Sequence, residues 1–213
     1  MALAGRAFLA LWNDIARPRE AEYDRWHTHE HVPERVAVKG FVGARRYVNR
    51  LRADHRYFTL YALDDLAALE HPEYLDLVDN PTAWSASMRP HFANVVRATG
   101  TLSASEGQGI GGALAVLAFR GADAAGATDA VMRADDVVAC HVGESRGATS
   151  PVRWTERLAG TAQVRDFDRL VLIEALDRAR AERALDGARI TMRLASLPRD
   201  FGNDVYDLAF VFP

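Results

Sequence analysis

The sequence predicts an α+β fold in which two βαββαβ units follow one another and pack as a barrel within one chain. The first half of the 213 residues reads as strand, helix, strand, strand, helix, strand, and the second half repeats that order. A glycine-rich stretch, 103–112, separates the two halves. One βαββαβ unit leaves a sheet face bare, and a second copy of the unit can cover that face.

In the first half, an apolar run at 6–14 ends in polar residues, which is typical of a first strand. The segment 18–38 is charged throughout and opens with Pro18, a residue suited to a first helical turn. We therefore expect a helix there. The remaining elements are strands at 40–51 and 55–63, helical segments at 64–78 and 81–92, and a strand at 93–102.

In the second half, the same patterns recur with fewer aromatic residues. Gly187 is predicted to end the last helix, because glycine commonly follows a helix C-terminus. The elements in order are strands at 113–121 and 136–145, with a weak helix at 122–134 between them, a polar loop at 146–165, a strand at 167–176, a helix at 177–187, and strands at 188–197 and 205–212.

The pattern divides the chain into a first unit at 1–104, a linker at 105–112 and a second, degenerate unit at 113–213. We expect the functional site in the first unit, because the helix at 122–134 has no histidine or aromatic residue and His141 is the one histidine of the second unit. A single larger α+β domain without internal symmetry is the alternative.

Composition narrows the classes of partner. The formal net charge of −3 gives no electrostatic reason to expect nucleic acid. No apolar run reaches the length of about 18 residues that a membrane-spanning helix needs, so no membrane partner is expected. Cys140 is the single cysteine and cannot form an intrachain disulfide, which favours a cytoplasmic location.

The segment WHTHEHVPERV, residues 26–36, places His27, His29 and His31 at every second position. A metal site needs converging ligands, but a helix scatters residues at this spacing. His27 and His29 flank the face of Trp26 on opposite edges, and His31 points further round. The face expected against the sheet also contains Tyr23, Glu30, Pro33 and Ala37.

Pro33 changes the directions in which this helix is expected to point its side chains. It has no N–H to donate and disfavours helix at the preceding residue, so we expect a kink or restart around 31–34 that turns His31 toward the sheet. A neutral imidazole beside Glu30 or Glu34 could then serve as a general acid–base. The sequence thus favours one functional imidazole over a metal site, and no metal ligands are predicted.

The same stretch resembles the helix-to-second-strand segment of the EthD-type and related dimeric α+β barrel proteins, which have a ferredoxin-like fold. His31-Val32-Pro33 matches a His-x-Pro motif, and Gly40-Phe41 with Arg45-Arg46-Tyr47 matches the turn and strand that follow it. The resemblance covers about 20–100. It implies a ligand between the first helix and the sheet, and His31 is the residue carried over as catalytic.

Other candidates follow from their expected positions near that space. His27 or His91 would assist His31 in catalysis. Arg46 would orient an anionic group, although only one of Arg46 and Tyr47 can face the pocket, because side chains alternate along a strand. The full substrate-binding set that we predict is Asn13, Tyr23, Trp26, Arg46, Tyr47 and Trp84.

The resemblance implies a cofactor-independent enzyme of the cyclase, isomerase or decarboxylase type, a lyase or isomerase acting on an aromatic or polyketide-like small molecule. No cofactor is expected, and a homodimer is compatible with the fold. Two alternatives stay open: a haem-binding or haem-degrading protein, and a non-catalytic ligand-binding or stress-related module.

Overall fold

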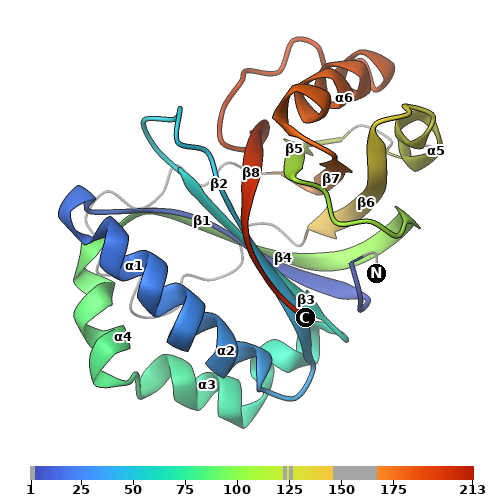
Figure 1. Cartoon of the computed structure of the whole chain (residues 1–213). Coiled ribbons are helices and arrows are strands. Elements are labelled where there is room, and N and C mark those ends of the chain that lie inside the picture. Colours follow the sequence, from blue (N-terminus) through green and yellow to red (C-terminus); the bar gives the residue numbers. More distant parts are fainter. Residues whose placement is uncertain (1–2, 122–123, 125–126, 146–166) are drawn as a thin grey trace.

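A computed structural model describes residues 3–121, 124, 127–145 and 167–213 (Figure 1). Within these residues, the strands close a barrel in the order β1-β3-β2-β8-β5-β7-β6-β4, and β4 returns to β1. Every neighbouring pair is antiparallel. The predicted α+β barrel of two βαββαβ units is confirmed. Closing the sheet pairs every edge strand.

The first unit supplies half of the barrel and most of the helices (Figure 1). Its strands take the order β4-β1-β3-β2 that a βαββαβ chain path produces. The elements are β1 Ala7–Ile15, α1 Glu20–Trp26, a π-helix His27–His31, α2 Val32–Val36, β2 Phe41–Val48, β3 Tyr57–Leu63, α3 Pro72–Asp79, α4 Ala83–Met88 and β4 Phe92–Gly107, with short 3-10 turns at Arg17–Arg19, Leu66–Glu70 and Arg89–His91.

The second unit repeats the order β8-β5-β7-β6. Its elements are β5 Ala113–Phe119, α5 Ala127–Met132, β6 Val137–Ser145, β7 Arg169–Ala175, α6 Arg178–Thr191 and β8 Asn203–Phe212. The polar loop expected at 146–165 lies outside the described residues. The two units join at the seams β2–β8 and β4–β6.

The structure differs from the predicted elements in two places, at the linker before the second unit and at the last helix of that unit. β4 continues to Gly107, so the linker expected at 105–112 begins as strand. The strand predicted at 188–197 is wrong, because α6 passes through Gly187 and ends at Thr191. Ala181, Leu185 and Ala188 lie on one buried face of that helix, and their packing against the second sheet outweighs the helix-ending tendency of glycine.

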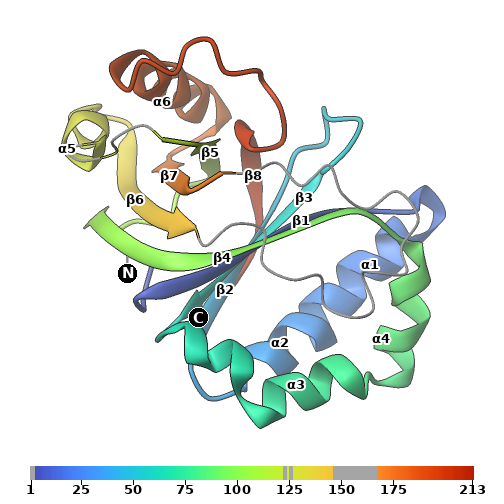
Figure 2. The ribbon, with the colours of Figure 1, turned by 180° about the vertical axis from the view of Figure 1, so that it is seen from behind.

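The barrel interior is a packed core rather than a channel. Trp12 packs against Phe58 at 4.7 Å between ring centroids and against Phe167 at 6.1 Å. The helices cover the outer faces of the barrel, with α1 to α4 on the first unit and α5 and α6 on the second (Figures 1 and 2). Separate clusters of buried hydrophobic side chains lie under the helices of the first unit and under those of the second. Within the described residues, no helix is both long and apolar enough to cross a membrane.

Candidate active site

The histidine-rich segment folds as a π-helix, His27–His31, between α1 and α2. Pro33 explains it: without an N–H at 33, the regular i→i−4 bond to the carbonyl of His29 cannot form. The backbone N–H of Val32 instead donates to the carbonyl of His27, five residues back. The kink predicted around 31–34 is therefore present one turn earlier, as a widened helical turn.

This widened turn moves the buried face of the segment. Tyr23, Trp26, His27, Val32 and Arg35 are buried, whereas Ala37 is exposed. The predicted face around Trp26 holds for Tyr23 and Trp26 but fails for Ala37, because the prediction assumed a uniform helical rotation. His27 and His31 now lie on the side that faces the sheet, and His29 is exposed.

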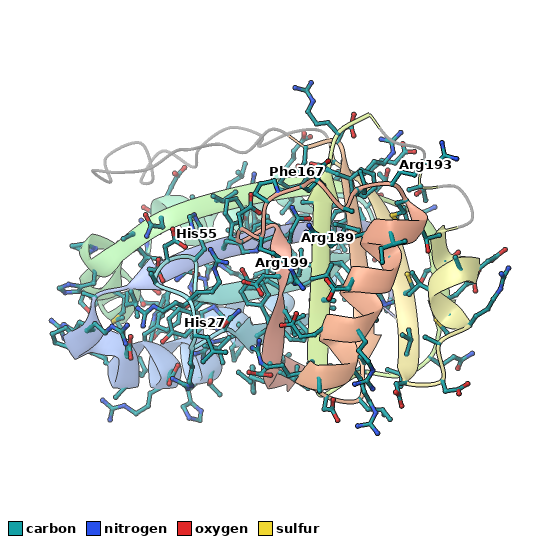
Figure 3. All side chains as sticks on the ribbon, turned by 90° about the horizontal axis from the view of Figure 1, so that it is seen from above. His27, His55, Phe167, Arg189, Arg193 and Arg199 are labelled. Atoms are coloured by element: carbon teal, nitrogen blue, oxygen red, sulfur yellow. The ribbon has the colours of Figure 1, made fainter. Side chains whose placement is uncertain are left out.

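A cavity of about 60 Å³ lies between this segment and the outer face of the first sheet. Figure 3 shows His27 in the first unit, on the half of the molecule opposite to Arg189 and Arg193. The cavity's lining comes from β1, α1, the π-helix, α2, β3, α4, the 3-10 turn Arg89–His91 and β4. The lining residues are Leu11, Asn13, Tyr23, Trp26, His27, His31, Arg35, Thr59, Ser85, Arg89, Phe92, Val95 and Arg97.

The two histidines of the cavity pack against each other. Their ring centroids are 5.1 Å apart and their planes lie 32° from parallel. The Nδ1 atom of each ring is buried and has no hydrogen-bond partner among the described residues. Nε2 of His27 lies 3.5 Å from Oγ1 of Thr59, the outer limit of a hydrogen bond. Both rings are thus free to accept or donate a proton toward a ligand.

Burial determines the charge of these imidazoles. Removal from water lowers the pKa of His31 well below its usual range, and the nearby charges of Arg35, His27 and Arg89 lower it further. Burial likewise lowers the pKa of His27, with smaller contributions from Arg46 and Arg35. Both rings are neutral at pH 7 and carry a lone pair that can accept a proton.

Aromatic rings form the wall next to the histidines. Trp26 packs against His31 with ring centroids 4.2 Å apart and planes tilted by 46°, and the ring of Tyr23 lies 5.2 Å from that of His27 and 5.7 Å from that of Phe92. The hydroxyl of Tyr23 donates to Oδ1 of Asn13 at 3.3 Å, and burial raises its pKa to about 12, so it stays protonated. The wall suits a flat apolar group with a polar edge.

Trp26 is locked in place by a polar cluster at the base of α4. Its indole Nε1–H donates to Oε1 of Glu30 and to Oγ of Ser85, each at 3.1 Å. Ser85 and Thr82 also donate to the same carboxylate oxygen, at 3.0 and 2.6 Å. Glu30 is therefore engaged by Trp26 rather than by a histidine.

Glu34 is also engaged elsewhere: Oε1 accepts from Arg35 at 2.7 Å. The expectation that Glu30 or Glu34 holds the catalytic imidazole finds no support in these contacts. The environment of His31 is instead aromatic on one side and cationic on the other, with Arg35 and Arg89 as the charged neighbours.

The structure brings together five of the predicted site residues: Asn13, Tyr23, Trp26, His27 and His31 all line the cavity. The other four do not.

Arg46, one of those four, is held by Asp24 and lies over the ring of Tyr23, 4.9 Å from its centroid. Tyr47 faces the barrel interior, where its hydroxyl donates to Glu174 at 2.7 Å. Trp84 packs against the buried cluster that contains Tyr23 and Trp26. His91 precedes β4, and its backbone carbonyl accepts a hydrogen bond from the N–H of Ala16.

Sequence reasoning missed the cationic and hydroxyl-bearing part of the lining. Arg35, Arg89 and Arg97 come from three separate elements, and arginine supplies nearly all of the basic residues in this chain, so none of them stands out. Ser85 and Thr59 are likewise unremarkable in sequence. One signal was available for Arg35: it lies four residues after His31, on the same side of a helical segment.

The described residues offer no metal centre. Among them, no group of three or more His, Cys, Asp or Glu side chains is placed to hold a metal ion. His29 lies on the exposed side of the segment, away from His27 and His31.

The fold and this helix-to-sheet cavity together define the structural class. Sequence comparison gives no match to a protein-family model and none to a curated protein. The solved structures do give matches, and the chain shares its α+β barrel fold with these neighbours.

Three of these solved structures match along almost the whole chain. An anthrone oxidase-like protein matches at a TM-score of 0.61 and 10% identity, over 99% of this chain and 94% of its own. A candidate monooxygenase from Fusobacterium nucleatum gives a TM-score of 0.58, 11% identity and coverages of 98% and 94%. A heme-binding protein from Thermus thermophilus gives a TM-score of 0.51 and 10% identity, over 100% of this chain and 91% of its own. At identities this low, the structural matches show a common fold alone.

Proposed function

We propose that the protein is a cofactor-independent enzyme that performs proton transfer on a small aromatic or polyketide-like molecule, with His31 as the general base. One observation carries the proposal: two neutral imidazoles, each with an unpartnered Nδ1, line a cavity walled by aromatic rings. A base in such a site need not lose a competing hydrogen bond from the described residues at Nδ1 before it reacts.

His31 is the stronger candidate of the pair. It is only half-buried at the rim of the cavity, whereas His27 lies deeper with 4% of its surface exposed. A substrate that enters from the rim meets His31 first. His31-Val32-Pro33 also carries the resemblance to EthD-type proteins, which supports the same assignment.

The proposed step is removal of a proton from a carbon next to a carbonyl group, or from an enolic or phenolic hydroxyl. The lone pair of His31 takes the proton, and the substrate keeps the electron pair as an enolate. His27, which packs against His31, and the protonated hydroxyl of Tyr23 would share or return a proton. Cyclisation, isomerisation and decarboxylation all begin or end with such a transfer.

The experiment that tests this function is solvent deuterium exchange. A panel of aromatic and polyketide-like ketones with acidic C–H groups is incubated with the protein in D2O, and deuterium incorporation is followed by NMR. We expect catalysed exchange for at least one panel member. His31→Gln, which keeps the size but lacks the base, should slow it by about 100-fold or more.

His29→Gln is the matched control, because His29 lies on the same turn and is exposed. This variant should retain the wild-type exchange rate. The proposal fails if the wild-type protein catalyses no exchange across the panel, or if His31→Gln exchanges as fast as His29→Gln.

Haem is the second ligand that the sequence allows, and one solved structure of this fold is named as a heme-binding protein. The residues of the cavity do not fit it. A porphyrin needs a flat slot beside its axial ligand, but Trp26 packs against His31 with ring centroids 4.2 Å apart. A haem titration that produces a Soret shift lost in His31→Gln would reverse this assignment.

A further inference from the structure

Glu30 contacts the wall of the candidate site from behind. It is not among the described residues that line the cavity. Its carboxylate oxygen Oε1 accepts three hydrogen bonds, from the indole Nε1–H of Trp26 at 3.1 Å, from Oγ of Ser85 at 3.0 Å and from Oγ1 of Thr82 at 2.6 Å. Trp26 and Ser85 both line the cavity. Glu30 therefore acts on the site through its neighbours.

The widened turn brings two residues of the same segment onto Trp26. Glu30 lies four residues after Trp26 and accepts from the N–H at the edge of the indole. His31 lies five residues after Trp26 and packs against its ring, with centroids 4.2 Å apart and planes tilted by 46°. Contacts at both separations are expected where a helix widens from i→i−4 to i→i−5 hydrogen bonding. The place of the indole against His31 is thus linked to its hydrogen bond with Glu30.

The buried indole depends on this acceptor for its orientation. Trp26 is 1% exposed, and Nε1–H is the one polar group of its side chain. A buried donor without a partner costs free energy, so the indole turns to where its acceptors lie. Ser85 is the second acceptor at 3.1 Å, but its own hydroxyl donates to Glu30 and is oriented by it. Both acceptors of Trp26 therefore depend on the same carboxylate.

The carboxylate also ties the π-helix to α4, which follows it in the chain by about fifty residues. Thr82 is the N-cap of α4: its Oγ1 accepts from the backbone N–H of Ser85 at 3.0 Å and donates to Glu30. One oxygen of Glu30 thus holds the first turn of α4 and the indole of Trp26 together. This link fixes the spacing of the two segments that meet at this side of the cavity.

We propose that Glu30 is a positioning residue that holds Trp26 against His31 and so keeps water away from the base. The inference rests on the proposed function, because His31 is the base in that proposal. Burial is the main reason that the pKa of His31 lies well below its usual range. Without Glu30 the indole is free to turn away, and water reaches the imidazole. A hydrated imidazole must give up that water before it meets a substrate.

The test compares Glu30→Ala with Glu30→Gln in the full-length protein. Alanine removes the acceptor, whereas glutamine keeps a side-chain oxygen at nearly the same place and lacks the charge. NMR follows the pH titration of His31 and the cross-peak between the rings of Trp26 and His31. We expect Glu30→Ala to weaken the cross-peak and to raise the pKa of His31 toward its ordinary value of about 6.5. Glu30→Gln should keep both as in the wild type.

The direction of the shift separates positioning from charge. Loss of a negative charge by itself lowers the pKa of a nearby histidine, so a rise reports hydration of the ring. Glu30→Asp, which keeps the charge but withdraws the oxygen by one methylene, is the second variant and should give a smaller rise. Glu70→Ala is the matched control, because Glu70 is exposed on the 3-10 turn Leu66–Glu70. A pKa of His31 that stays unchanged or falls in Glu30→Ala and Glu30→Asp, or that rises equally in Glu30→Gln, would overturn the proposal.

Failure of this inference can be told apart from failure of the proposed function, because the titration of His31 is read without a substrate. Glu30→Ala should also slow deuterium exchange by about tenfold, less than His31→Gln, since the base is still present. If the pKa of His31 is unchanged while His31→Gln still abolishes exchange, the base is correct and the role of Glu30 is wrong. If that pKa rises as expected but His31→Gln exchanges normally, Glu30 positions Trp26 and the base is wrong.

Discussion

His31 is a weak base because of its surroundings, which are aromatic on one side and cationic on the other. Trp26 excludes water from one face of the ring, and His27 lies against it at 5.1 Å between centroids. A charged imidazole there would lose hydration and meet Arg35 and Arg89. These residues therefore hold the ring neutral, and a neutral ring is the form that can accept a proton at pH 7.

The histidine pair gives the folded state a pH dependence. Because the folded-state pKa of each ring is lowered, the unfolded chain takes up protons first as the pH falls below about 6.5, and unfolding becomes easier. The loss is at most about 1.4 kcal/mol per pH unit for each ring. Urea unfolding at pH 7.5 and 5.5 should show a smaller loss for the variant with both His27→Gln and His31→Gln than for wild type.

The readout is the difference between the two pH values, so a constant destabilisation caused by the substitutions does not affect it. His29→Gln serves as the control and should follow the wild-type curve. Equal pH dependence in wild type and the double variant would show that these rings do not titrate as described.

At the residue scale, the sequence predicted the aromatic and imidazole part of the site and missed its charged part. Periodicity along one helix and the end of one strand were sufficient to place Tyr23, Trp26, His27 and Asn13. Arg89 and Arg97 reach the cavity from a later turn and strand, and only the tertiary fold brings them there. A single sequence without pairing information carries no signal for such a meeting.

The element that determines the site is the π-helix. A regular α-helix would have placed His27 and His31 according to a uniform rotation, and the prediction made that assumption. The missing N–H of Pro33 allows the turn to widen, so that Val32 donates to His27 across five residues. The prediction correctly attributed an irregular turn to Pro33, but it placed that turn around 31–34 rather than at His27–His31.

Replacing Pro33 by alanine tests whether this turn positions the base. Alanine restores a donor at position 33 and favours a regular helix. We expect the folded variant to lose the close contact between Trp26 and His31, which lie five residues apart with ring centroids at 4.2 Å, seen as an NMR cross-peak, and to slow deuterium exchange by on the order of 100-fold. Ala37→Ser, an exposed change at the end of the same segment, should alter neither. An intact contact and full activity in Pro33→Ala would contradict the role given to the turn.

The misassigned strand in the second unit has a similar cause, because the local sequence pattern does not show tertiary packing. ARITMRLASL, residues 188–197, contains β-branched residues and alternation, which favour a strand in isolation. In the folded chain, α6 continues to Thr191, and Arg193 adopts the left-handed φ of 57° just beyond its end. Burial of one helical face decided the outcome, and this tertiary packing is not visible in the local pattern.

At the scale of the whole molecule, the two units differ in what lies between helices and sheet. In the first unit that space holds the cavity, and in the second unit the described part is an apolar cluster around Leu117, Val171, Ile173 and Leu185. His141 lies opposite Leu172 on the interior side of the barrel and donates to or accepts from Ser105 at 2.7 Å. That the first unit carries the functional site stays a prediction.

A buried ion pair links the two units through the barrel interior. Arg45 on β2 donates to Glu174 on β7 at 2.7 Å, and the exposed fractions of the two side chains are 7% and 0%. Tyr47 and the N–H of Gly111 also donate to that carboxylate. The pair lies away from the cavity, so it should affect stability rather than activity.

Substitution of one partner leaves the other buried without its counter-charge. We expect Arg45→Met to lower the free energy of unfolding by about 3–5 kcal/mol, and the double change Arg45→Met with Glu174→Leu to cost clearly less. Chemical denaturation of both variants measures this. Costs that simply add, with the double variant the least stable, would rule out a coupled pair.

The central claim is that His31 removes a proton from the bound substrate. It is tested most directly by the rate of deuterium exchange in His31→Gln relative to His29→Gln, with the same panel compound in D2O. The account predicts a difference of about 100-fold or more between these two neighbouring variants. Equal rates would contradict it.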